Sequence, residues 1–491
     1  MESAAGDDGQ PLLMTDVEAQ QQAAAQQQAA LPQSRKSSRV QALDIVRGFT
    51  VCVMILVDDA GESWQSIDHS PWNGITLADI VMPWFLFMVG VSIAISFRKF
   101  EGSAANRSDG FRKLVLRSLK LFALGLALQG GGWPDTDTYT WGWDLSTIRW
   151  CGILQRIAFA YFVVGICKLY IPPSHKPTGS ALDLITMYTR HWFVVACFVI
   201  VYLALTFGTA VPDWTVENTT NVIKCGGRKG DLGPFCNAAG YYDRLLFGQS
   251  HLYRPGEKIR LPECSQCSPG NCPRQDAPAW CAAPFDPEGA LASLLTVLST
   301  YIGVHFGHAI KLARAGAREQ HLLLSMWTVS AVACLVIGAA TIPGFACNKQ
   351  LWSPAYALIN AGMTGSALIV VFGLCDVLKS RLAQVICRPF QLVGMNALLV
   401  FVFGASDVLN TVLDSVYWKD PGNNLTNQAQ KQLFNSWMKG SSRWATAANA
   451  TVSQRESASH AVGILMWVIC KIAFWVVVCA VCHKSRWYWK F

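Results

Sequence analysis

One stretch of the chain joins a polar loop directly to a long apolar run: His69-Ser-Pro-Trp-Asn-Gly-Ile-Thr-Leu-Ala-Asp-Ile-Val-Met-Pro-Trp-Phe-Leu-Phe-Met-Val-Gly90. A titratable side chain at the mouth of a membrane-spanning segment is costly, so such residues mark functional sites. Imidazole also titrates near neutrality, which suits proton transfer. The stretch therefore predicts a membrane helix with a reactive histidine, His69, at its entrance.

Apolar runs of this kind recur along the whole chain of 491 residues, which is 52% hydrophobic and 15% charged. Soluble domains average roughly 25% charged residues, so a water-soluble protein is disfavoured. About ten segments reach the roughly 20 residues that cross a bilayer as a helix. We expect an all-α, polytopic integral membrane protein in contact with lipids. The segments are centred near Met54, Phe87, Leu124, Phe162, Ile200, Thr300, Ala333, Ile369, Val400 and Phe474.

Basic residues divide the connections between these segments into two alternating classes. Residues 59–74 and 130–147 contain no Lys or Arg, whereas the connections on either side of them do. Short basic loops stay in the cytosol, and both residues 35–39 and residues 484–490 are basic. Both termini are therefore expected in the cytosol, with His69 on the lumenal side. The formal charge of +8 belongs to these loops, and no basic stripe suggests a nucleic-acid partner.

Two long connections, residues 212–285 and 411–459, are predicted to be lumenal. They contain the sequons at Asn218, Asn424 and Asn449, and glycosylation occurs in the lumen. The first also contains six cysteines, Cys225, Cys236, Cys264, Cys267, Cys272 and Cys281. We expect disulfides of undetermined connectivity there. A zinc site is the alternative, but no histidine flanks the cluster.

The N-terminal residues 1–38 are rich in Gln and Ala and have no apolar core. They predict a disordered cytosolic tail rather than a cleaved signal peptide. Asp8 followed by Leu12 and Leu13 resembles the acidic dileucine signals that sort proteins to lysosomes or vacuoles. We therefore expect a multi-pass protein of a lysosomal or vacuolar membrane.

Several motifs occur in order along residues 39–491. They are Arg39-Val-Gln-Ala-Leu-Asp-Ile-Val-Arg-Gly48, His69-x2-Trp72-Asn73-Gly74-x-Thr76-x-Ala78-Asp79-x3-Pro83-Trp84-Phe85, Arg149-x2-Gly-Ile-Leu-Gln-Arg156, Gly248-Gln-x-His-Leu-Tyr253, Asp286-Pro-Glu-Gly289 and Gly394-Met-Asn396. Together they resemble the heparan-α-glucosaminide N-acetyltransferase family. The family's additional N-terminal lumenal domain is not seen in this sequence.

The resemblance implies a transmembrane acyltransferase domain over residues 39–491. Such an enzyme takes acetyl from cytosolic acetyl-CoA, its co-substrate, and delivers it to the amine of a lumenal glucosamine. No metal is implied. His69 matches the family's catalytic histidine, acting either through an acetyl-histidine or as a base in direct transfer. A homodimer is left open as a partner.

A catalytic histidine needs a second group to orient it, and Asp58 and Asp59, at the lumenal end of the first segment, are the nearest candidates. The family's lysosomal members carry asparagine at the position of Asp58. Asp79 is a further candidate for the active site, but Thr76-x-x-Asp79 also resembles a helix capping box. The sequence leaves both functions of Asp79 open.

Basic residues inside the segments are candidates for holding acetyl-CoA. Arg156 lies about 10 Å deeper than Arg149 on the same helix face at 1.5 Å per residue. We expect Arg156 to pair with an acidic group such as Asp79 or to contact the CoA arm. Arg47 in the first segment, and Arg117 and Lys120 at the start of the third, suit the CoA phosphates. A pair between Arg47 and Asp44 is the alternative.

The acceptor sugar is expected near four residues of the family motifs. Asp286 and Glu288 are candidates for its hydroxyls or amine, although Pro287 between them equally suggests a simple helix start. Trp72 and Asn73, close to His69, are the others. Two further functions stay open: an acyltransferase for another glycan or lipid-linked acceptor, and a small-molecule transporter.

Overall fold

The computed structural model describes residues 40–61, 64, 66–100, 103–129, 131–132, 142–175, 183–217, 219–253, 260–264, 277–313, 319–405, 408–429 and 452–489. The expected disordered tail, residues 1–38, lies outside these ranges. So do Asn218, Asn449, Cys267 and Cys272.

Helices make up nearly all of the regular structure. The long helices are α2 (Gln41–Ala60), α3 (Leu77–Ser96), α4 (Ala104–Gln129), α5 (Ile153–Tyr170), α7 (Thr189–Gly208), α9 (Ala290–Ala313), α10 (Glu319–Thr341), α11 (Pro354–Val371), α12 (Arg381–Met395) and α16 (Val452–Lys484). The shorter helical elements are η2 (Phe97–Phe100), α6 (Asp183–Thr186), α8 (Ala238–Phe247), η3 (Gln249–His251), η5 (Ala279–Cys281), η6 (Phe372–Val377), α13 (Ala397–Val400), η7 (Phe401–Ala405) and α14 (Val408–Asp414).

The described strands are short and form antiparallel pairs. β1 (Gly131–Gly132) pairs with β2 (Gly142–Trp143), β3 (Trp214–Thr215) with β4 (Val222–Ile223), and β5 (Tyr417–Trp418) with β6 (Asp420–Asn424). The registers place Gly131 opposite Trp143, Trp214 opposite Ile223 and Tyr417 opposite Asn424. The all-α prediction is therefore confirmed.

The polytopic prediction is also confirmed, but the count of about ten spans is not. Among the described residues, seven helices are long and apolar enough to cross a membrane: α3, α5, α7, α9, α10, α11 and α16. The pair α12 and α13 makes an eighth if its 77° bend lies within one span. The other two expected segments are the helices α2 and α4, which carry too many charges. In α2 these include Asp44, Arg47, Asp58 and Asp59.

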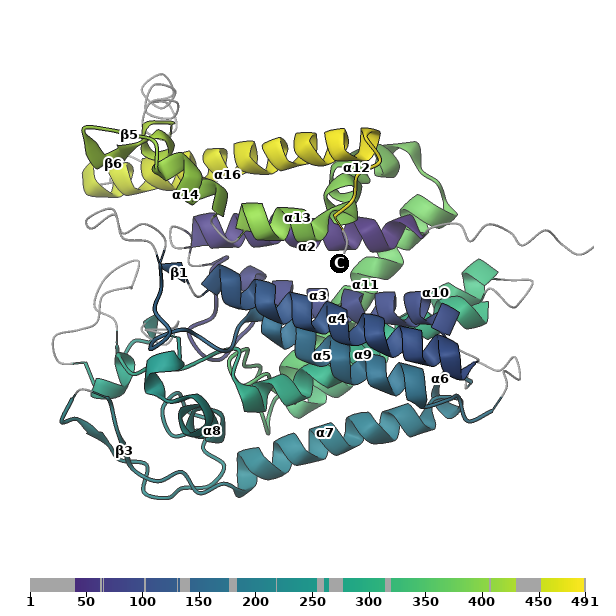
Figure 1. Cartoon of the computed structure of the whole chain (residues 1–491), viewed down its shortest axis with the longest axis horizontal. Helices are drawn as coiled ribbons and strands as arrows, with labels where there is room; N and C mark the ends of the chain where they lie inside the picture. The colour runs from purple at the N-terminus through teal and green to yellow at the C-terminus, as the bar shows by residue number, and fades with distance from the viewer. Residues whose placement is uncertain are drawn as a thin grey trace, which may run out of the picture. The chain divides into compact units, whose positions relative to one another are not determined.

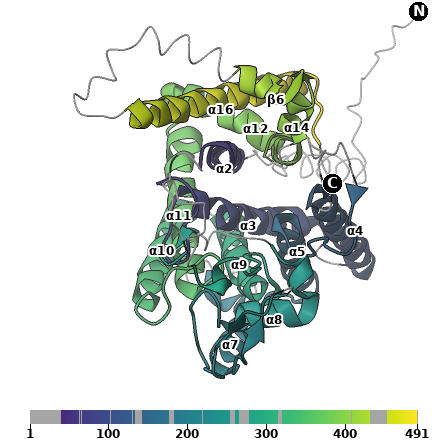
Figure 2. The same cartoon turned by 90° about the vertical axis from the view of Figure 1, so that its left-hand side faces the viewer.

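Helices α3 and α9 lie against each other at the centre of the bundle (Figures 1 and 2). A Cβ atom on Gly90 would lie 1.8 Å from the carbonyl oxygen of Thr300, and one on Gly303 would lie 2.0 Å from that of Phe87. Only glycine permits this approach of two backbones, as is typical of membrane helix interfaces. The contact fixes the position of α3, whose first turn carries the candidate site.

Other helices cover the two sides of this central pair. In both views α7 lies on the far side of α9, whereas α2 lies on the other side, next to α3. Helices α12 and α16 pack on α2. Lys471 of α16 reaches Asp59 of α2 with 2.8 Å between Nζ and Oδ2, and the two side chains are 3% and 10% exposed. A buried charge needs a partner of this kind.

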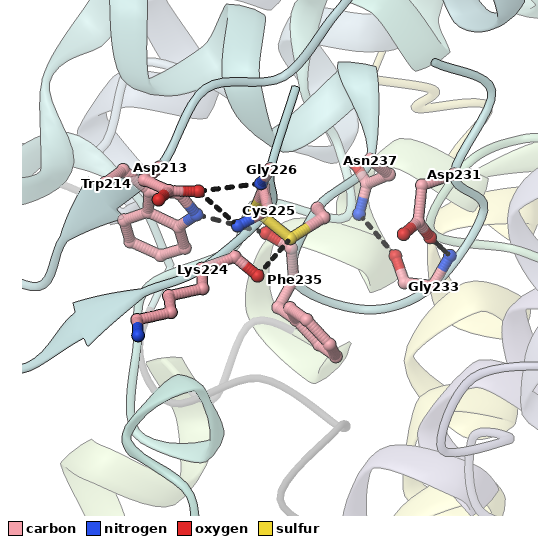
Figure 3. The surroundings of a disulfide bond; sticks show 10 residues. Asp213, Trp214, Lys224, Cys225, Gly226, Asp231, Gly233, Phe235 and Asn237 are labelled. Atoms are coloured by element: carbon pink, nitrogen blue, oxygen red, sulfur yellow. Dashed lines mark hydrogen bonds between the residues drawn. A yellow bond between two sulfur atoms is a disulfide. The ribbon is translucent and has the colours of Figure 1, made fainter. Parts of the chain in front are cut away.

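Disulfides organise the segment between α7 and α9. Cys225 bonds to Cys236 and Cys264 bonds to Cys281. Figure 3 shows the first bond beside Asp213, whose carboxylate accepts the backbone N–H groups of Gly226 and Cys225 at 2.7 and 2.6 Å. These hydrogen bonds lower the pKa of Asp213. The predicted disulfides are confirmed, and Cys264 is not free to be a zinc ligand.

Candidate active site

The imidazole of His69 faces the carboxylate of Asp79 at the start of α3. Their Nδ1 and Oδ1 atoms are 2.8 Å apart. The Asp79 side chain is fully buried, whereas that of His69 is 27% exposed. An ionised carboxylate accepts only, so this contact assigns the proton to Nδ1 and leaves a lone pair on Nε2. Such an imidazole can act as a base or as a nucleophile.

The second oxygen of Asp79 caps α3. Its Oδ2 accepts the backbone N–H groups of Ser70 and Thr76, both at 3.1 Å, and the Thr76 hydroxyl at 3.0 Å. The return contact to Thr76 is the capping-box arrangement that the sequence suggested. The two interpretations of Asp79 are therefore compatible, because each uses a different oxygen.

A cation that the sequence reasoning missed completes the constellation. The Nζ atom of Lys349 lies 3.1 Å from both ring nitrogens of His69, and its residue is only 7% exposed. Because Nδ1 donates its proton to Asp79, Lys349 can donate only toward Nε2. Lys349 also interacts electrostatically with Asp79. One signal pointed to it: Lys349 is a base in a short connection expected on the lumenal side, where the charge rule disfavours bases.

The loop that carries Lys349 is tied to the loop that carries His69. Gly74 donates its N–H to the carbonyl of Cys347 at 2.8 Å, and Asn348 Nδ2 donates to Asn73 Oδ1 at 3.2 Å. Just after this loop, Ser353 caps α11, and the Tyr356 hydroxyl donates to the backbone carbonyl of Asp79 at 2.6 Å. These contacts bring α3 and α11 together at the site.

Arg260, also missed from the sequence, holds the other side of the histidine. Its guanidinium donates to the carboxylate of Asp68 and to the backbone carbonyl of His69. The Asp68 carboxylate accepts the N–H of His69 at 2.6 Å. The backbone of His69 is thus restrained from a segment 191 residues further along the chain.

The structure does not place Asp58 or Asp59, the expected orienting groups, beside His69. Asp59 pairs with Lys471, and Asp58 is exposed. Neither of these two described carboxylates contacts His69. The physical reason is that the turn of residues 66–76 folds His69 back onto its own downstream helix, where Asp79 is the nearest carboxylate.

Arg156 and Asp79 do not form the expected ion pair. Arg156 donates to Ser293 Oγ at 3.1 Å and to the carbonyl of Pro287 at 2.8 Å, and its guanidinium lies over the ring of Trp352. Within the described ranges no carboxylate lies within 4.0 Å of it. Arg156 is only 2% exposed, so its guanidinium is surrounded by protein and does not face a surface open to the CoA arm.

Arg149 binds Asp286 and Glu288, the two carboxylates expected from the sequence to lie near the acceptor sugar. Its Nε and Nη2 atoms each lie 2.7 Å from an oxygen of Asp286, and Nη2 also donates to Glu288. Asp286 and Glu288 are 1% and 7% exposed. Both carboxylates are therefore engaged in a buried ion cluster at the start of α9. From the sequence they were instead candidates for the sugar site.

Of the expected ligands of the CoA phosphates, Arg47 lies on α2, whereas Arg117 and Lys120 lie on α4. Arg47 pairs with Asp44 at 3.5 Å, as the alternative predicted, and donates to Ser92 Oγ of α3 at 2.9 Å. Arg117 lies over the ring of Tyr161. Arg117 and Lys120 are exposed in the middle of α4, not at its start, because the helix already begins at Ala104.

Trp72 and Asn73 border a cleft next to the histidine loop. Trp72 is buried and donates its indole N–H to the carbonyl of Leu232 at 2.9 Å, while Asn73 is exposed. The cleft has a volume of about 470 Å³ and lies between this loop and the disulfide-bonded segment. Among the described residues no group of three metal-binding side chains is found.

Residues 39–215, which include His69 and Asp79, match the family described as heparan-alpha-glucosaminide N-acetyltransferase, catalytic. This chain is similar to those enzymes. It is 29% identical to the heparan-alpha-glucosaminide N-acetyltransferase of Mus musculus over 392 residues, which are 76% of this chain and 54% of that protein. Its identity to the Homo sapiens protein of the same name is 28%, over 74% of this chain and 52% of that protein.

The resemblance seen in the motifs is thus confirmed. The chain spans about half the length of the relatives that it matches. Lys349 lies outside the matched residues 39–215.

Proposed function

We propose that this protein is a transmembrane N-acetyltransferase that moves acetyl from cytosolic acetyl-CoA to a lumenal glucosamine-type amine. The observation that carries the proposal is the pair of His69 and Asp79, with 2.8 Å between Nδ1 and Oδ1. This pair leaves Nε2 as a base or nucleophile at the entrance of a membrane helix. The names of the similar proteins support the same chemistry.

Two routes use the lone pair on Nε2. In direct transfer, the amine nitrogen forms a bond to the thioester carbon, Nε2 accepts the amine proton, and the carbon–sulfur bond breaks to release the CoA thiolate. In the relay, Nε2 itself bonds to the thioester carbon, and the carbon–sulfur bond breaks to release the thiolate. The amine nitrogen then bonds to the acetyl carbon, the bond to Nε2 breaks, and Nε2 accepts the amine proton. In both, Asp79 stabilises the positive charge that develops on the imidazole.

Lys349 also has a role in this proposal, as a hydrogen-bond donor to the thioester. The thioester carbonyl oxygen becomes an oxyanion when its carbon is attacked. When the thioester binds, the buried ammonium group, 3.1 Å from Nε2, can move its hydrogen bond from that nitrogen to the carbonyl oxygen, which frees the Nε2 lone pair. Such preorganised donors often provide the largest share of the rate enhancement.

We further propose that Arg47, Arg117 and Lys120 bind the phosphates of CoA at the cytosolic mouth. Arginine suits bidentate phosphate contact, and Arg117 and Lys120 are exposed on α4. The same proposal includes cytosolic termini, lumenal loops and a lysosomal or vacuolar membrane. Protease protection of each terminus in sealed vesicles tests the orientation.

The function is tested with the full chain reconstituted in vesicles, with radiolabelled acetyl-CoA outside and glucosamine inside. We expect labelled N-acetylglucosamine to form inside, and to disappear in His69→Ala. The matched control is His321→Ala, which removes an exposed histidine at the start of α10 and should leave the rate unchanged.

Other outcomes contradict the proposal. Release of unmodified glucosamine from the vesicles would indicate a transporter. Acetylation that survives His69→Ala would remove the histidine from the mechanism. Acetyl-CoA turnover that requires a different acceptor would support an acyltransferase for another glycan or a lipid-linked sugar.

A further inference from the structure

The cleft beside the histidine loop has the walls of a sugar site. Its volume of about 470 Å³ falls in the range of roughly 300–1,000 Å³ that is typical of ligand pockets. Phe235 and Trp280 stack on each other on one wall, with ring centroids 5.0 Å apart and planes 24° from parallel. Both rings are partly exposed. Aromatic faces of this kind pack against the apolar faces of sugar rings.

This wall is held rigidly. Trp214 donates its indole N–H to the carbonyl of Phe235 at 3.2 Å, and the next residue, Cys236, is bonded to Cys225 (Figure 3). Trp280 precedes Cys281, which is bonded to Cys264. Each of the two aromatic residues is therefore adjacent to a disulfide, so the cleft is preformed.

The cleft is also coupled to the proposed reactive residue. Asn73, four residues after His69, borders it, and so do Leu261 and Glu263, which follow Arg260 closely in the chain. Arg260 binds the backbone carbonyl of His69. His69 itself does not border the cleft. The cleft thus lies next to the reaction centre and is suited to the part of an acceptor that follows the reacting sugar.

The charge of the cleft determines which charge the sugar next to the reacting one can carry. Glu263 is the charged side chain among its described lining residues, and it is exposed. Within the described ranges no cation lies within 4.0 Å of its carboxylate. Arg260, the nearest base in sequence, is already engaged with Asp68. A carboxylate in this position attracts an ammonium group and repels a uronate.

We propose that this cleft binds the second sugar of an oligosaccharide acceptor, and that it selects a cationic amino sugar over an anionic one. Phe235 and Trp280 hold the ring, and Glu263 binds its ammonium group. The inference rests on the proposed function, and it sets this chain apart from proteins whose names specify heparan, an acidic glycan. The natural acceptor is then a short chain of amino sugars.

Binding is measured by calorimetry on the purified full chain, without turnover. The probes are glucosaminyl-glucosamine, which is cationic, and glucosaminyl-glucuronic acid. We expect the cationic disaccharide to bind about tenfold more tightly than the anionic one. Glu263→Gln should bring the two Kd values together, Glu263→Lys should invert their order, and Trp280→Ala should weaken both. The matched control is Glu217→Gln, an exposed carboxylate outside the cleft, which should keep the preference.

Equal or tighter binding of the anionic disaccharide would overturn the inference, as would a preference that survives Glu263→Gln. These outcomes leave the proposed function standing if glucosamine is still acetylated in vesicles. Conversely, selective binding without any acetyl transfer would support the cleft and contradict the proposed function alone.

Discussion

The imidazole of His69 and the carboxylate of Asp79 are in direct contact, with 2.8 Å between Nδ1 and Oδ1, while the other carboxylate oxygen caps the helix that Asp79 begins. One buried side chain therefore orients the proposed reactive histidine and fixes the start of α3. The two tasks can be separated by mutation.

Asp79→Asn should lower the acetyl-transfer rate by roughly 10²–10⁴-fold, the usual contribution of a general base. An amide can donate to Nδ1 and thereby favour the unproductive tautomer, with the proton on Nε2. Initial rates in vesicles measure the effect. Thr76→Val is the control, since it removes a hydroxyl from the cap but not the contact with His69. Thr76→Val should lower the free energy of unfolding by about 1 kcal/mol and retain most of the transfer rate. A normal transfer rate in Asp79→Asn would show that the contact between His69 and Asp79 is not needed for catalysis.

Lys349→Met should reduce the transfer rate by about 10²-fold, because one donor to the developing oxyanion is worth this much. The binding of acetyl-CoA should change little, which separates a transition-state role from simple binding. The rate of acetyl transfer, measured at saturating acetyl-CoA, tests this expectation. Lys224→Met, which removes an exposed lysine of the disulfide-bonded segment, is the matched control. An unchanged rate in Lys349→Met would exclude the oxyanion role.

Asp286→Asn should lower the melting temperature, since it breaks a buried ion cluster with Arg149; losses of about 3–5 kcal/mol are usual for such a break. If Asp286 instead binds the sugar, KM will rise without a change in melting temperature. Thermal unfolding and acceptor kinetics on the same preparation distinguish these cases. Asp109→Asn, in the exposed pair with Lys113, is the control and should change stability by about 0.5 kcal/mol at most.

Asp243 should make the protein less stable as the pH rises from 4 to 7. Burial raises the pKa of Asp243 from 3.8 to about 7, so within this window the folded protein keeps a proton that the unfolded chain releases. Folding is then disfavoured progressively as pH increases, and the loss levels off above the folded pKa. Its Oδ1 accepts the N–H of Ala290 at 2.8 Å, a contact that asparagine can retain.

Melting temperatures at pH 5 and pH 7.5 check this dependence. The difference between them should shrink in Asp243→Asn. Asp231→Asn, whose carboxylate accepts the N–H of Gly233 in a nearby turn, controls for the loss of one carboxylate in the same segment. A pH dependence that Asp243→Asn leaves intact would rule out Asp243 as its source.

Prediction from the sequence succeeded where the controlling interactions are local. The apolar runs became helices, and the spacing from Thr76 to Asp79 became a cap, because both depend on residues within a few turns of one another. Two expected spans, α2 and α4, formed as helices but carry charges that local length counting did not weigh. Arg149 and Asp286 were both noticed, but 137 residues separate them and nothing local joined them.

The sequence by itself determined an all-α membrane protein, its family resemblance and the choice of His69, because hydrophobic length, helix caps and motifs are properties of short segments. Only the tertiary structure decided which charges meet. Lys349 reaches His69 from 280 residues away, Asp59 pairs with Lys471, and Arg156 does not pair with Asp79. A buried charge takes the partner that helix packing brings within reach, and that packing is set by contacts such as those of Gly90 and Gly303, far from the charges themselves.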